Sequence, residues 1–134
     1  MDNIGGILPD SYGLSLTVFA TDATPENPIM PGEVLVLANT GPYQARRAAA
    51  GEAVQLVSKD TARDEETPLG VHVAGFSRNI SAKYTGEIAV GNSVEADGAG
   101  GVRAAVDGMG AAVNNGTYVV KVDTVRKKIE VLIP

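Results

Sequence analysis

The sequence has no cysteine and no tryptophan, and its few aromatic residues are scattered. Without cysteine, the chain cannot form disulfides, thiolate metal sites or a cysteine nucleophile. Two Phe and four Tyr give no stacking platform of the kind used by carbohydrate-binding modules and single-strand nucleic-acid grooves. No run approaches the roughly 20 apolar residues of a membrane span. Because Met1–Leu8 also lacks a basic region, we expect no signal peptide and no membrane partner.

Basic residues are missing from the N-terminal third of the chain. The net charge is -5, from 16 acidic and 11 basic residues, and the first base is Arg46. Residues 1–45 carry five acids and no base, so the rest of the chain is neutral. Binding to nucleic-acid phosphates requires clustered Lys and Arg. The one basic cluster, Arg126–Lys128, has three residues and is predicted to be a solvated hairpin tip, so we expect no nucleic-acid partner.

The 134 residues are 44% apolar, which is enough for one folded domain. Four of the seven prolines lie in the first 31 residues, which excludes a continuous helix or central strand there. One strand-like run, Leu14–Phe19, interrupts this region. We predict an extended acidic arm and connector over residues 1–31 and a β-rich domain over residues 32–134. The alternative is that Leu14–Phe19 is an ordinary strand of the core and that Met1–Asp10 is a disordered tail.

The predicted arm combines unpaired acids with apolar side chains, which suits a basic groove on a neighbouring subunit. We therefore expect it to make the partner contact while residues 32–134 fold alone. The candidate partner-binding residues are Ile4, Ile7, Leu8, Tyr12, Leu14, Leu16 and Phe19.

From Glu33 onward the chain is a series of short strand patterns separated by turn residues. Val34–Leu37 is a continuous apolar run, which indicates a strand covered on both faces. Because a small domain can obtain such cover from another copy, we expect a dimer or trimer. The other candidate strands are Tyr43–Arg47, Ala53–Val57, Leu69–Phe76, Glu87–Val90, Ser93–Ala96 and Val102–Val106, with Asn79–Tyr84 ambiguous.

The C-terminal segment gives the clearest pattern. Tyr118–Val122 and Ile129–Ile133 alternate in polarity around Asp123–Lys127, which predicts a β-hairpin. Helix signals are weak, since Gly108 and Gly110 interrupt the alanine-rich stretch around them. The pattern predicts an all-β fold, either a β-sandwich of jelly-roll type or a small β-barrel.

No residue pattern indicates catalysis. His72 is the single histidine and lies in the middle of a predicted strand. The sequence has no G-x-S-x-G motif to supply a serine nucleophile for which His72 could act as the general base. Asp60, Asp64, Glu65 and Glu66 lack the glycine turn of a calcium loop and alternate with bases, so a solvated loop is favoured. Gly98–Gly101 lacks phosphate-loop spacing and is predicted to be a turn. We expect no enzyme activity, no metal and no cofactor.

The segment Gly86–Val102 contains a strand ending in V-G-N, then V-E-A-D, a glycine turn and a new strand. This order resembles the small decoration, or cement, proteins of tailed-phage capsids. Gly70–Ala74 and the closing hairpin fit the same family, and the resemblance covers roughly Gly32–Pro134. It implies a structural virion protein that binds the outer surface of the capsid shell and stabilises it. The implied partner is the major capsid protein, and the implied location is the capsid surface after assembly in the host cytoplasm.

Two other classes of function stay open at this point. A small β-barrel enzyme would need a second catalytic group near His72. A non-catalytic ligand- or receptor-binding β module would use loops such as Lys59–Pro68. An enzyme would show a deep pocket with perturbed titratable groups, and a binding module would show a concave site on a self-sufficient monomer.

Overall fold

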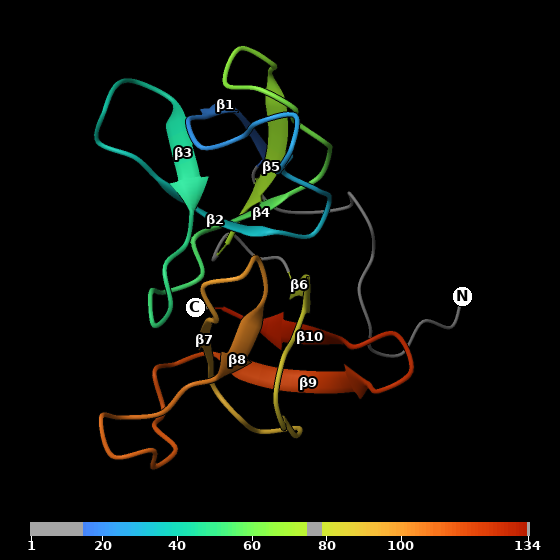
Figure 1. Cartoon of the computed structure of the whole chain (residues 1–134). Helices are drawn as coiled ribbons and strands as arrows, with labels where there is room; N and C mark the ends of the chain where they lie inside the picture. The colour runs from blue at the N-terminus through green and yellow to red at the C-terminus, as the bar shows by residue number, and fades with distance from the viewer. Residues whose placement is uncertain (1–14, 75–78, 134) are drawn as a thin grey trace.

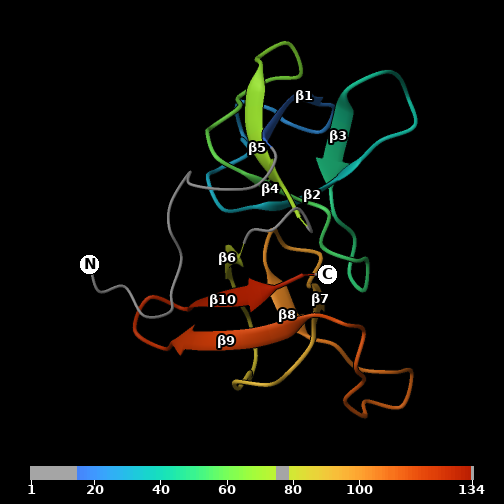
Figure 2. The ribbon, with the colours of Figure 1, turned by 180° about the vertical axis from the view of Figure 1, so that it is seen from behind.

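The computed structural model describes residues 15–74 and 79–133, which form ten strands (Figure 1). In chain order these are β1 (Ser15–Ala20), β2 (Val34–Leu37), β3 (Gln44–Arg47), β4 (Leu56–Ser58), β5 (Leu69–Val73), β6 (Asn79–Lys83), β7 (Val94–Ala96), β8 (Val102–Ala104), β9 (Tyr118–Asp123) and β10 (Lys128–Leu132). The first five strands occupy the upper part of Figure 1 and the last five the lower part, and Figure 2 shows the same division from behind. We call residues 15–74 the barrel and residues 79–133 the C-terminal half.

The barrel is a closed sheet with the strand order β1-β3-β2-β4-β5, and β5 pairs back onto β1. Its interior follows from the alternation of side chains along each strand. In β1, Val18 and Ala20 are fully buried, whereas Thr17 and Phe19 are exposed. Leu35 of β2 and Leu69 of β5 complete the same core cluster. A small barrel is therefore one of the two folds that the sequence left open.

The C-terminal half contains the sheet β6-β10-β9 and the two-stranded sheet β7-β8. A few backbone hydrogen bonds and one isolated bridge join these sheets. The backbone of Val119 in β9 hydrogen-bonds to Gly91 and Asn92, just before β7. Tyr84, just after β6, forms a parallel bridge to Val102 in β8. The five strands thus surround their own interior without a continuous ladder.

The two halves share one hydrophobic cluster. Leu35 points into the barrel, while Val34 and Val36 on the opposite face of β2 pack with Ile129 and Val131 of the C-terminal half. The prediction that this run is covered on both faces is confirmed for these three β2 residues. The cover comes from the same chain, so the run gives no independent reason for self-association, which stays a prediction.

The N-terminal region differs from the expected arm and connector. β1 pairs with β5 over four residues and with β3 over two, so residues 15–20 are part of the barrel wall. Ile29, in the expected connector, is fully buried and bridges to Ala62. A boundary at residue 31 would therefore cut through the barrel core. Of the alternative, the core strand is observed over residues 15–20, because alternating apolar side chains can fill one face of a closed sheet, while Met1–Asp10 lies outside the described residues.

Of two further strand patterns in the sequence, one is confirmed by the structure and the other is wrong. The C-terminal hairpin is confirmed as β9 and β10. Glu87–Val90, however, forms no strand, and a turn spans residues 89–92 where Asn92 Oδ1 accepts a hydrogen bond from Ala89 N. β7 pairs instead with β8 across the glycine turn at 97–101. The side-chain bond of Asn92 favours a closed turn over a hairpin ladder.

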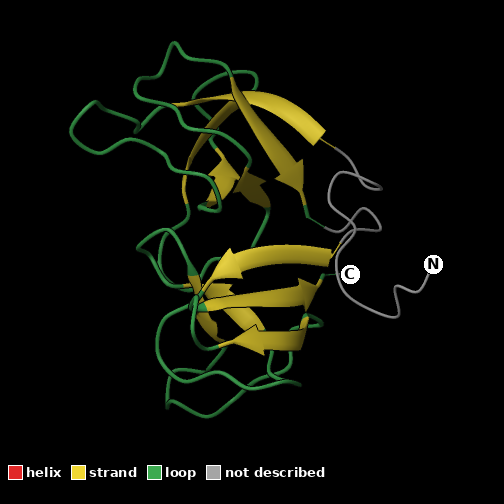
Figure 3. Cartoon of the chain, turned by 90° about the vertical axis from the view of Figure 1, so that its right-hand side faces the viewer, coloured by secondary structure: helices red, strands yellow, loops and turns green. Residues whose placement is uncertain are grey.

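The described residues include no helix, in agreement with the weak helix signals, and Figure 3 shows strands joined by loops. No helix within residues 15–74 and 79–133 has the length and hydrophobicity needed to cross a bilayer. The fold is therefore all-β.

Candidate functional site

Titratable side chains do not gather into a reactive cluster in the described part of the chain. No group of three or more His, Asp or Glu residues there could hold a metal ion. His72 is half-buried in the middle of β5, opposite Ser15 on one side and Val57 on the other. That position in a closed sheet is the structural one that the sequence favoured.

The acidic loop between β4 and β5 is exposed to solvent, as expected. Asp60, Asp64, Glu65 and Glu66 are all exposed. Asp64 accepts hydrogen bonds from the Thr67 hydroxyl at 2.8 Å and from Glu66 N at 3.0 Å. The Thr67 bond is the main cause that holds the pKa of Asp64 below its ordinary value. The carboxylate is thus used to shape its own turn.

In each half, ion pairs join segments that lie close together along the chain. Arg46 binds Glu52 through two parallel hydrogen bonds of 2.8 and 2.9 Å. These bonds, together with one from Ala49 N, lower the pKa of Glu52 to about 2. In the C-terminal half, Arg103 pairs with Glu95 at 2.7 Å across β7 and β8. The carboxylates of Glu52 and Glu95 each form an ion pair with an arginine, so neither is placed to act as a general acid or base.

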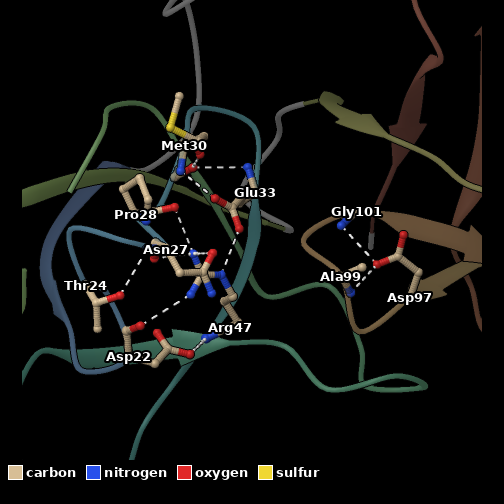
Figure 4. A network of polar contacts seen from close by, with 11 residues as sticks. Asp22, Thr24, Asn27, Pro28, Met30, Glu33, Arg47, Asp97, Ala99 and Gly101 are labelled. Atoms are coloured by element: carbon tan, nitrogen blue, oxygen red, sulfur yellow. Dashed lines mark hydrogen bonds and ion pairs between the residues drawn. The ribbon is translucent and has the colours of Figure 1, made fainter. Parts of the chain in front are cut away.

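A network of polar contacts centres on Arg47 at the end of β3 (Figure 4). Its Nε donates to Glu33 Oε1 at 3.0 Å, and its Nη2 donates to the carbonyls of Asn27 at 3.0 Å and Pro28 at 2.8 Å. Its backbone N donates to Asp22 Oδ2 at 2.9 Å. Arg47 and Glu33 have mostly buried side chains. One arginine therefore fixes the loop that leads from β1 to β2.

This network changes how the acidic N-terminal third should be understood. The sequence predicts that acids without local bases need an outside partner. In the structure, Glu33 is paired with Arg47, so the barrel neutralises this acid itself. Arg46 and Arg47 are the first two bases of the chain, which is the sequence signal that could have identified them.

The turn from Asp97 to Gly101, which we call the junction turn, connects the two halves. Asp97 Oδ1 accepts hydrogen bonds from Ala99 N and Gly101 N, as Figure 4 shows. The Gly100 carbonyl accepts a bond from Val34 N in the barrel. A Cβ atom on Gly101 would lie 2.7 Å from the Lys83 carbonyl oxygen. Glycine is required here by close backbone approach, which confirms the predicted turn and gives it a structural role.

A groove of about 540 Å³ lies between the halves, beside the junction turn. Pro28 and Met30 line it from the barrel, and Lys83, Tyr84 and Lys127 line it from the C-terminal half. The Lys127 ammonium lies 4.6 Å from the centre of the Tyr84 ring. Apart from this cation–π contact, Arg126, Lys127 and Lys128 are exposed, as predicted for a hairpin tip.

The structure does not gather the predicted arm residues into one site. Leu16 is partly buried against the barrel core, and Phe19 is 36% exposed on the outer face of β1. Their opposite orientations follow from the period of two along a strand. Five of the seven lie outside the described residues, namely Ile4, Ile7, Leu8, Tyr12 and Leu14. Their partner contact stays a prediction.

No protein-family model matches the sequence, and no curated protein matches it. Among solved structures, the fold is similar to the crystal structure of the head fiber gp8.5 N base in bacteriophage phi29. The TM-score is 0.67 at 14% sequence identity, and the alignment covers 90% of this chain and 93% of that chain. At this level of identity the likeness establishes a shared fold.

Proposed function

We propose that the chain is a structural protein of a tailed-phage virion and that it binds the outer surface of the capsid as a cement protein. The observation that carries this proposal is the fold similarity to a head-fiber base over 90% of the chain. The Gly86–Val102 pattern, which resembles decoration proteins, supports the same class only in its second part, where β7, the glycine turn and β8 follow one another, since no strand ends at V-G-N. The carboxylates of Glu52 and Glu33 in the barrel are ion-paired with Arg46 and Arg47, which is consistent with a non-enzymatic role.

A cement protein has to resist deformation, and three features support that role. The barrel closes on itself, the two halves share a hydrophobic cluster, and the junction turn bonds one to the other. In this proposal the major capsid protein is the partner, and a dimer or trimer forms on the shell. In the same proposal, the residues of the predicted arm that precede β1 add a second contact.

The direct test uses shells of the phage that encodes this chain. Purified protein is mixed with shells that lack it, and binding is measured by co-sedimentation. We expect saturable binding and a higher temperature of shell disruption when the sites are filled, because a ligand of the assembled state stabilises that state. Binding without a change in disruption temperature would support a virion role and contradict the cement role. Absence of binding would contradict both.

A non-catalytic ligand- or receptor-binding module is the second candidate, and the groove at the junction favours it. The groove combines apolar Met30 and Pro28 with basic Lys83, Arg126 and Lys127. The acidic Glu33 and Asp97 also line it, but their carboxylates accept hydrogen bonds from Arg47 and from backbone N–H groups. Such a lining suits a small acidic ligand. Met30→Glu should then abolish ligand binding and leave binding to shells unchanged, since the two candidates use different surfaces.

A further inference from the structure

The connection between β8 and β9 ends in the segment Asn114–Thr117, which we call the docked segment. Asn115 in this segment is the one asparagine of the chain that a glycine follows directly. Because Gly116 has no Cβ, its backbone nitrogen can approach the side-chain carbonyl carbon of Asn115 with little steric hindrance. Asn115 is also exposed to solvent. This pair of residues can therefore react in water without an enzyme.

The reaction is an intramolecular displacement that converts the amide into a carboxylate. The Gly116 nitrogen loses its proton to the solvent and bonds to Cγ of Asn115. The bond from Cγ to Nδ2 breaks, and Nδ2 takes up a proton and leaves as ammonia. Water then opens the cyclic succinimide at either of its carbonyl carbons, which leaves aspartate or isoaspartate at position 115. Water is the only co-reactant.

In the folded protein, the nitrogen that attacks, the nitrogen that leaves and the carbonyl oxygen all have hydrogen-bond partners. Gly116 N donates to Asn114 Oδ1 at 2.9 Å, and Asn115 Nδ2 donates to the Val94 carbonyl at 2.8 Å. Asn115 Oδ1 accepts bonds from Thr117 N at 3.0 Å and from the Thr117 hydroxyl at 2.6 Å. Ring closure has to break the first two of these bonds.

These contacts act on the reaction in opposite directions. The Thr117 donors by themselves favour ring closure, because they stabilise the negative charge that develops on Oδ1 during the attack. The Val94 carbonyl, however, only accepts hydrogen bonds, so it cannot give Nδ2 the proton that it needs to leave. Asn114 Oδ1 belongs to a neutral amide and is too weak a base to remove the Gly116 proton. We therefore expect the fold to oppose the reaction.

The docked segment is also a connection between the two sheets of the C-terminal half. The hydroxyl of the buried Ser93, just before β7, accepts a bond from Asn115 N at 3.2 Å and donates to the Thr117 carbonyl at 2.8 Å. Val94 N donates to the Thr117 hydroxyl at 2.8 Å. Because Thr117 directly precedes β9, these bonds join the start of β7 to the start of β9.

We propose that Asn115 is a deamidation site that the fold protects and that acts as a one-way latch. While the segment is docked, the side chain remains an amide. When the segment opens, Gly116 can attack, and the resulting carboxylate has no proton to donate to the Val94 carbonyl. Two acceptor oxygens then face each other, so the segment cannot dock again in the same way. This inference concerns the chain alone and is independent of the proposed function.

The first measurement compares the full chain in its folded state and unfolded in guanidinium chloride, at the same pH and temperature. Peptide mapping by mass spectrometry reports the fraction of aspartate and isoaspartate at position 115. Because opening breaks several hydrogen bonds, we expect conversion in the folded chain to be more than about tenfold slower. Equal rates in the two states would overturn the proposal, and so would faster conversion in the folded chain, which would mean that the Thr117 donors dominate.

Two matched variants test whether the docked segment provides the protection. Ser93→Ala removes the hydroxyl that bonds to this segment, whereas Thr85→Ala removes a hydroxyl that donates to Asp97 at 3.0 Å elsewhere in the C-terminal half. At a temperature where circular dichroism shows both variants to be folded, we expect Ser93→Ala to speed conversion about tenfold. Thr85→Ala should leave the rate unchanged. Equal rates for the two variants would contradict protection by the docked segment.

A second pair of variants tests the latch. Asn115→Asp introduces the carboxylate of the product, which loses the donor to Val94. Asn114→Asp adds the same charge one residue earlier, where the side-chain oxygen acts as an acceptor and a carboxylate keeps that role. At neutral pH we expect Asn115→Asp to lower the melting temperature by about 3–6 °C and Asn114→Asp to change it little. Equal melting temperatures would show that the product docks as well as the amide, and the latch would be wrong.

Discussion

The barrel and the C-terminal half each contain five short strands, but they are held together differently. The barrel closes through paired strands all the way round. The C-terminal half joins its two sheets through two backbone hydrogen bonds of Val119 and a single bridge at Tyr84. Its core cluster also includes Val34, Val36 and Val57 from the outer wall of the barrel. We infer that the barrel has a hydrophobic core of its own, whereas the C-terminal half needs side chains of the barrel to complete its core.

The surfaces of the two halves differ as well. Residues 15–74 contain eight acidic and four basic residues, and residues 79–133 contain six of each. The acids of the barrel lie largely on exposed loops, whereas acids and bases balance in the C-terminal half.

The largest effect is expected from N-terminal truncation, which separates the barrel from any arm before it. Removing residues 1–14 should preserve a cooperative thermal transition, because every strand of the barrel is retained. Removing residues 1–31 takes away β1 and the buried Ile29. That truncation opens the closed sheet, and we expect it to abolish the transition measured by circular dichroism.

The outcome of the longer truncation also decides how the acidic third of the chain is used. A folded protein lacking residues 1–31 would contradict the barrel described here. It would restore the sequence-based hypothesis that residues 32–134 fold alone.

A pair of core substitutions tests whether the two halves unfold together. Leu35→Ala in the barrel and Ile129→Ala in the C-terminal half each remove a fully buried side chain. Each should lower the free energy of unfolding by about 2–5 kcal/mol. Because the halves share a cluster, both variants should shift one common calorimetric transition. Two transitions, with each variant shifting its own, would show that the halves are energetically independent.

The junction turn allows a sharper test of the connection between the halves. Gly101→Ala would place a Cβ atom 2.7 Å from the Lys83 carbonyl oxygen, so the backbone has to move. We expect a loss of about 1–3 kcal/mol in the free energy of unfolding. Gly108→Ala in the connection between β8 and β9 is the control, because nothing lies within 4 Å of the added atom. Equal stability of the two variants in urea titrations would mean that the junction tolerates displacement.

The smallest effect concerns the rim of the barrel and depends on pH. The Arg46 bonds lower the pKa of Glu52 from 4.5 to about 2. A carboxylate with a lowered pKa stabilises the folded state above pH 4.5, and that contribution is lost as the pH falls through about 2. Glu52→Gln should therefore melt at a lower temperature than the unaltered protein at neutral pH. The difference should shrink between pH 4.5 and 2. Glu87→Gln removes the same charge from an exposed residue outside this ion pair and is the charge-matched control at neutral pH.

Much of the local structure could be predicted from the sequence. The run Val34–Leu37 and the closing hairpin were located correctly because side-chain alternation and turn residues act over a few positions. The prediction of a strand at Glu87–Val90 was wrong because the side chain of Asn92 closes a turn there. The role of Arg47 was missed, since its partners Asp22 and Asn27 are 20 or more positions away in the chain.

The all-β character, the absence of cysteine chemistry and the positions of most strands could be predicted from the sequence. These properties depend on composition and on residues that are close to one another along the chain. Tertiary structure alone decided that β1 closes the barrel, since Ser15 meets His72 from a distant part of the chain. It also decided that Met109 is exposed while the equally apolar Val102 is fully buried. Apolar residues fill an interior only where distant strands meet to form one, and that meeting is a property of the whole fold.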